Sequence, residues 1–174
     1  MALAEPWLRG PLPGISSLLL PAAHALVAAR EDVTNAVEGL TAEQLWLAPS
    51  GISTLGFHLA HLAGSTDRLL TYARGEALSP AQREVLAFER TLADTRPPLE
   101  QLLTTWHGVA DAALQQLAST PEPALSAARA VGRAQLPSTV LGLLFHAAEH
   151  AARHAGQVVT TSKLVRGMAA AAGG

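Results

Sequence analysis

The stretch Phe145-His-Ala-Ala-Glu-His-Ala-Ala-Arg-His-Ala-Gly-Gln-Val158 places His146, His150 and His154 at intervals of four residues. At about 100° per residue of an α-helix, these side chains fall within an arc of about 80° on one face. The apolar residues of the same helix form a stripe that passes close to His150 and His154. This pair is therefore predicted to point inward, and two imidazoles one turn apart can hold one metal ion.

The histidines also have a simpler interpretation. A histidine on an apolar helix face is usually a core or border residue with one satisfied hydrogen bond. A metal ion held by two side chains alone would bind weakly. The metal-site hypothesis therefore needs a third ligand from another part of the chain.

The overall composition predicts a single all-α domain. The chain has 174 residues, enough for one substantial core but not for two comfortable ones. Hydrophobic residues make up 49% of the chain and aromatic residues only 4%. Alanine and leucine dominate, which is typical of helices packed on helices.

Charge and cysteine content exclude several classes of function. The net charge is −2 and no stretch concentrates lysine and arginine on one face, so a nucleic-acid partner is not expected. The chain has no cysteine, which excludes disulfides, thiolate ligands and a cysteine nucleophile. No apolar run reaches the ~18 residues of a membrane span. We expect no membrane partner and a cytoplasmic location.

Four long amphipathic patterns follow an arm that is rich in proline and glycine. Residues 1–16 are expected to form a flexible arm with Trp7 as its anchor. Apolar residues at spacings of three and four predict the long helices. Their approximate ranges are 17–40, 55–74, 99–117 and 138–166. The core is thus expected to span residues 17–166, and residues 167–174 to form a disordered tail.

The connections between these helices carry signals of their own. A capping box at Thr41-Ala-Glu-Gln44 and the sequence Ser79-Pro80 each predict the start of a short helix. Residues 124–137 are alanine-rich and weakly periodic, which indicates a linker with some helix. The expected architecture is an all-α four-helix bundle with long connections that carry short helices.

In such a bundle the second long helix can supply the third ligand, because it carries His58 and His61. Three nitrogen ligands leave at least one coordination position open for water or a substrate atom, as in catalytic metal sites. Zn, Ni and Fe all suit imidazole ligands.

Two polar neighbours of the histidines are less informative. Glu149 lies about 100° from His150 around the helix, which favours a surface residue over a catalytic base. Gln157 lies on the histidine face and can either orient a ligand or form an ordinary interhelical hydrogen bond.

The histidine motifs resemble those of a known family. His61-Leu-Ala-Gly-Ser-Thr-Asp-Arg68 on the second long helix and Glu149-His-Ala-Ala-Arg-His-Ala-Gly-Gln-Val158 near the C-terminus resemble the DinB/YfiT-like family of metal-dependent proteins. The resemblance spans most of the chain. It implies a four-helix bundle that often dimerises, with His61, His150 and His154 as the metal ligands.

The resemblance also implies a chemistry. Characterised relatives are thiol S-transferases and a mycothiol-dependent maleylpyruvate isomerase, in which a metal ion activates a low-molecular-weight thiol. The leading hypothesis is therefore a metal-dependent S-transferase or isomerase, in which the metal-activated thiol is presented to a small electrophilic substrate. The alternatives are a metal-dependent hydrolase and a non-catalytic bundle that binds metal or dimerises. Ser65, Arg68 and Tyr72 are candidates for substrate contact because they lie near the His61 face.

Periodicity and resemblance disagree about the third ligand. His58 lies closer than His61 to the stripe formed by Leu55, Leu62 and Leu69, so periodicity alone favours His58. The motif favours His61, which is followed by Leu-Ala. We follow the motif and expect His58 to be a core-edge residue or a partner of a ligand.

A homodimer is also expected. Leu141, Phe145 and Ala152 lie on the face of the last helix opposite the histidines and need a cover. A second copy of the chain, or another helix of the same chain, would provide it.

Overall fold

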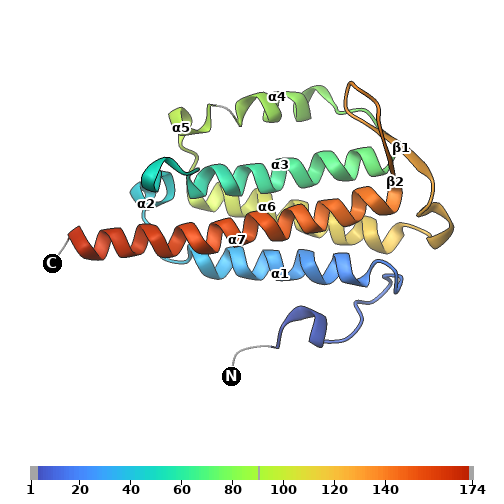
Figure 1. The fold of residues 1–174 in the computed structure, drawn as a ribbon, viewed down its shortest axis with the longest axis horizontal. Coiled ribbons are helices and arrows are strands. Elements are labelled where there is room, and N and C mark those ends of the chain that lie inside the picture. Colours follow the sequence, from blue (N-terminus) through green and yellow to red (C-terminus); the bar gives the residue numbers. More distant parts are fainter. Residues whose placement is uncertain (1–3, 90, 173–174) are drawn as a thin grey trace.

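Four long helices form the body of the protein (Figure 1). The computed structural model describes residues 4–89 and 91–172. The long helices are α1 (Leu20–Val37), α3 (Leu55–Ala73), α6 (Leu99–Ser119) and α7 (Val140–Ala172). Helix α7 packs against α1 and α3, and α6 packs against the same two helices. The predicted helical class is confirmed, since the described chain is mostly helical.

Each long helix buries an apolar stripe close to the predicted one. In α1 the buried side chains include Leu26, Val33 and Val37. In α6 the buried stripe includes Trp106, Ala110 and Ala113. Helix α3 is buried on most of its circumference. A side chain on α3 therefore lies near a neighbouring element in almost any direction, which makes this helix suited to carry a site.

Side-chain caps start several of the helices. Thr41 begins α2 (Ala42–Trp46) with the predicted capping box, in which its hydroxyl accepts from the Gln44 amide. Thr54 caps α3 by accepting from the amide of Phe57. Thr139 accepts from the amide of Gly142 and so caps α7.

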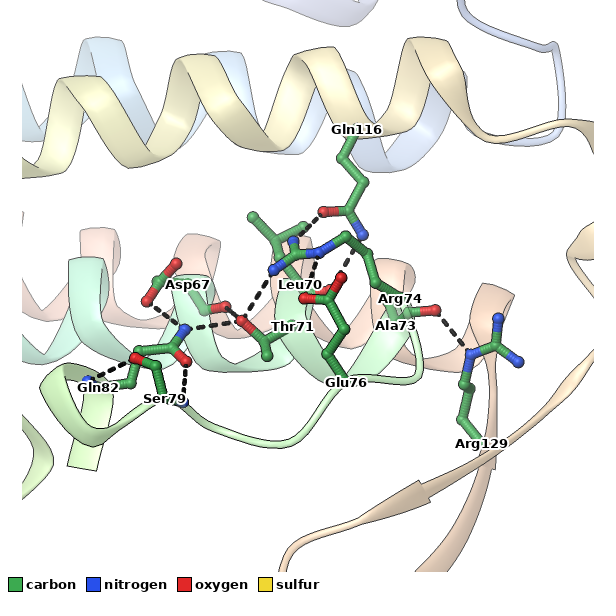
Figure 2. A network of polar contacts seen from close by, with 10 residues as sticks. All are labelled: Asp67, Leu70, Thr71, Ala73, Arg74, Glu76, Ser79, Gln82, Gln116 and Arg129. Carbon is green, nitrogen blue, oxygen red and sulfur yellow. Dashed lines mark hydrogen bonds and ion pairs between the residues drawn. The ribbon is translucent and has the colours of Figure 1, made fainter.

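Helix α4 (Pro80–Phe88) starts with a second capping box, formed by Ser79 and Gln82. The Gln82 side chain also crosses to α3, where its Nε2 donates to Asp67 Oδ2 and Thr71 Oγ1, each over 2.7 Å. Figure 2 shows this network at the far end of α3, together with Arg74, which donates to Gln116 of α6. Polar contacts thus fasten the connection after α3 to the body of the protein.

The connection at residues 124–137 differs from the prediction of a partly helical linker. It contains the antiparallel strands β1 (Ala128–Val131) and β2 (Leu136–Thr139). Gly132 opens the turn with φ +67°, a conformation that favours glycine. Arg129 donates from Nε to the carbonyl of Ala73, at the end of α3, over 2.8 Å. These tertiary contacts override the modest helix propensity of the alanines.

The ends of the chain differ from the prediction in two details. Trp7 does not anchor the N-terminal arm, because its side chain is 62% exposed. Arg9 anchors it through an ion pair with Glu31, and His24 bonds to the carbonyl of Gly10. Helix α7 continues to Ala172, past the predicted end at residue 166, because alanine is the best helix former and needs no core to continue a helix.

The short elements complete the described chain. They are the 3₁₀ turns η1 (Pro6–Leu8), η2 (Pro49–Gly51) and η3 (Glu122–Ala124), and the helix α5 (Leu92–Thr95). Among the residues that the structure describes, we find no helix with the length and apolar character needed to cross a membrane.

Candidate metal centre

Three histidines meet where α3 and α7 lie side by side. His61 comes from α3, and His150 and His154 come from α7. Each ring offers a nitrogen atom, and these atoms all lie within 4.8 Å of one another. All three residues are partly buried. We call His61, His150 and His154 the three-histidine cluster.

The His61 ring is held by a buried carboxylate. Its Nδ1 lies 2.8 Å from Oε2 of Glu89, which directly follows α4. Burial disfavours the Glu89 carboxylate, but hydrogen bonds from His61 and Arg68 outweigh burial, so the pKa of Glu89 is lowered. An ionised carboxylate only accepts hydrogen bonds, so His61 donates from Nδ1, and in the neutral ring the lone pair is then on Nε2.

The free nitrogen of His61 faces His150. The two Nε2 atoms lie 3.2 Å apart. Two ligand nitrogens on one tetrahedral zinc ion, each at 2.0–2.1 Å, lie roughly 3.3 Å apart. Nδ1 of His150 is buried and has no hydrogen-bond partner in the described part of the chain. A buried nitrogen without a hydrogen-bond partner, next to two Nε2 atoms that face each other, is consistent with a bound metal ion at this place.

His154 has a fourth histidine as its partner. Its Nδ1 lies 3.1 Å from Nδ1 of His58, which is only 7% exposed. One of these two nitrogens donates and the other accepts, so the pair fixes the ring of His154. His58 is therefore a buried partner of a cluster residue, and it is not part of the three-nitrogen group.

Burial favours the neutral form of His58, His150 and His154. Burial, followed by the charge of His61 and other neighbours, lowers the pKa of His150. Burial, followed by the charges of His150, His61 and His58, lowers the pKa of His154 to about 4. Burial and the charge of His61 also lower the pKa of His58. Histidine binds metal only in its neutral form, so the lowered pKa values of His150 and His154 favour metal binding.

Of the proposed substrate contacts on α3, two already have partners within the protein. Ser65 is buried and donates to the carbonyl of Leu62, and Arg68 is buried against Glu89. Tyr72 is half-buried against the core. These contacts leave Ser65 and Arg68 little freedom to meet a substrate.

The polar neighbours on α7 lie at the surface. Glu149 pairs with Arg153 and with His146, whose Nδ1 is 3.2 Å away. Gln157 is exposed, and none of the hydrogen bonds of the described residues involves its side chain. Glu149 is thus the predicted ion-paired surface residue.

Sequence reasoning missed Glu89 and the ring of Phe57. Glu89 follows a short helix, and no motif marks it. Phe57 stacks on His61, with ring centres 5.5 Å apart and planes inclined by 8°. Its position four residues before His61 on one helix face was a usable signal.

A cavity of about 580 Å³ lies elsewhere, between the N-terminal arm and α1. Its lining includes Trp7, His24 and Glu31 but no member of the three-histidine cluster. The chemistry of the cluster, rather than the size of this cavity, identifies the candidate site.

Comparison with known proteins agrees with the geometry. A search of curated proteins found no match. Residues 25–158 match the family model described as the DinB superfamily. The match covers most of the chain and includes all three histidines of the cluster. The chain therefore belongs to the DinB superfamily.

Proposed function

We propose that the protein is a metal-dependent enzyme of the four-helix-bundle type, with His61, His150 and His154 as ligands of one divalent transition metal ion. The observation that carries the proposal is the convergence of three nitrogen atoms within 4.8 Å on partly buried rings. A set of three neutral imidazoles suits Zn, Ni or Fe and leaves at least one position open.

We further propose that the reaction transfers a low-molecular-weight thiol to a small electrophilic substrate. When bound, the ion would supply a Lewis acid that lowers the pKa of the thiol. Phe57 covers one face of His61 and so shields part of the ring from water. Glu89 and His58 hold the rings of His61 and His154 through their Nδ1 atoms. Membership of the DinB superfamily supports this chemistry because thiol transfer is known among characterised members.

A hydrolase has weaker support. Hydrolysis at such a centre commonly uses a carboxylate as general base beside the metal-bound water. Glu89 has both oxygens engaged, and Glu149 is ion-paired at the surface. Neither carboxylate is free to take a proton from water at the cluster.

A homodimer completes the proposal. Phe145 is 57% exposed and Leu141 39% exposed on α7, and Ala152 on the same face is also exposed. No other helix of the described chain covers this face. A second copy of the chain would bury these apolar side chains.

The test combines metal loading with a screen of thiols. The metal-free protein is loaded separately with Zn, Ni or Fe and assayed with thiols and electrophilic substrates, with His150→Ala as the matched control. The proposal predicts thiol transfer that needs both the metal and His150, with the fold retained after chelation. Loss of the fold on chelation would indicate a structural ion, and transfer without metal would refute the proposal.

A further inference from the structure

Helix α4 is attached to the protein in an unusual way. None of its residues from Pro80 to Phe88 is buried, and the apolar side chains Val85, Leu86 and Phe88 are exposed. A helix normally docks by burying an apolar face. Here the docking depends on polar side chains at the two ends of the helix.

The first attachment lies at the start of α4. The side chain of Gln82 is used twice: its oxygen accepts from the Ser79 amide, and its nitrogen donates to Asp67 and Thr71 of α3 (Figure 2). This attachment lies beyond the histidines along α3. It fixes where α4 begins.

The second attachment is Glu89, which lies seven residues after Gln82 and directly follows α4. Its side chain is only 7% exposed, and both carboxylate oxygens are engaged. Oε1 accepts from Arg68 over 2.6 Å, and Oε2 accepts from His61 Nδ1 over 2.8 Å. Arg68 balances the charge of the carboxylate, so the buried pair is neutral overall.

A glycine of α3 makes room for this carboxylate. A Cβ atom at Gly64 would lie 2.5 Å from Glu89 Oε1 and 2.8 Å from Arg68 Nη1. Glycine within a helix is destabilising relative to alanine. At Gly64 the missing side chain permits the close approach of Glu89 to α3.

We propose that Glu89 is the positioning residue of the metal centre, and that α4 serves to deliver its carboxylate to His61. The proposal rests on the proposed role of His61 as a ligand. Glu89 acts through His61 rather than on the metal, since both of its oxygens are already occupied. By holding the proton on Nδ1, it keeps the Nε2 lone pair directed at His150, and such carboxylate partners are known to orient metal-binding histidines.

The test compares Glu89→Gln, which keeps the size of the side chain but removes its charge, with Glu84→Gln. Glu84 is an exposed residue of the same helix and serves as the matched control. Two quantities are measured: the Zn affinity, by competition with a chromophoric chelator, and the tautomer of His61 in the metal-free protein, by ¹⁵N NMR.

We expect Glu89→Gln to lower Zn affinity by about tenfold to a hundredfold and to shift His61 from the Nδ1–H form to a mixture of tautomers. Glu84→Gln should change neither quantity. An unchanged His61 tautomer in Glu89→Gln would overturn the proposal, whatever the affinity. If the wild-type protein bound no Zn, the proposed function would fail, while the tautomer would still decide the role of Glu89.

Discussion

Replacing Gly64 with alanine tests whether the missing side chain is what allows Glu89 to approach α3, without altering any functional group. The added methyl group would lie 2.5 Å from Glu89 Oε1 and 2.8 Å from Arg68 Nη1. Both distances are shorter than a carbon atom tolerates, so the two side-chain ends must move. Since Oε2 of the same carboxylate bonds to His61, the movement disturbs that hydrogen bond as well.

The expected change in stability is the difference of two effects. Alanine is favoured over glycine within a helix by roughly 0.5–1 kcal/mol. Weakening one hydrogen bond between charged groups costs roughly 1.5–3 kcal/mol. Gly64→Ala should therefore destabilise the protein by about 0.5–2.5 kcal/mol and should also weaken metal binding.

The matched control is Gly108→Ala on α6, where an added Cβ would meet no atom within 4 Å. Urea denaturation should give Gly108→Ala a free energy of unfolding higher by roughly 0.5–1 kcal/mol. If Gly64→Ala were stabilised to the same extent and kept the metal affinity of the wild type, the close approach of Glu89 to α3 at Gly64 would be refuted.

Two further predictions concern the histidines, and a third concerns the exposed face of α7. The pKa of His154 is lowered to about 4 in the folded state, against about 6.5 unfolded, so the unfolded state binds more protons in this interval. The free energy of unfolding of the metal-free protein should therefore fall as the pH decreases from about 6.5 to about 4. Urea denaturation at constant ionic strength that shows no such fall would contradict the lowered pKa of His154. His61→Ala should lower metal affinity by orders of magnitude, whereas His58→Ala should lower it by at most about a hundredfold in calorimetric titrations; the reverse order would make His58 the ligand. Light scattering should give a dimer that Phe145→Glu dissociates, and a wild-type monomer at micromolar concentration would count against the dimer.

Much of the helical framework could be predicted from local sequence. The capping boxes at Thr41 and Ser79 depend on side chains three residues apart, and both form as expected. The approach of His150 and His154 follows from helix geometry alone. The selection of His61 over His58 came from the family motif, because the angular difference between the two residues is small compared with the curvature of a real helix.

The parts that could not be predicted depend on contacts between distant segments. The strands around Gly132 have only four residues each, and β2 shows no alternation of exposed and half-buried side chains, so the sequence signal that marks a strand is weak. Glu89 is separated by 28 residues from His61, and its burial depends on the space left by Gly64. The contact between His58 and His154 joins two helices whose register the sequence does not reveal.

The most direct test of the metal centre is the amount of Zn bound by the purified chain at neutral pH, measured by equilibrium dialysis. The wild-type protein should bind about one ion per chain, because three imidazole nitrogens lie within 4.8 Å of one another. The double variant His150→Ala, His154→Ala should retain its helical circular dichroism and bind none. A wild-type protein that binds no metal, or a double variant that binds it undiminished, would contradict the assignment of these histidines as ligands.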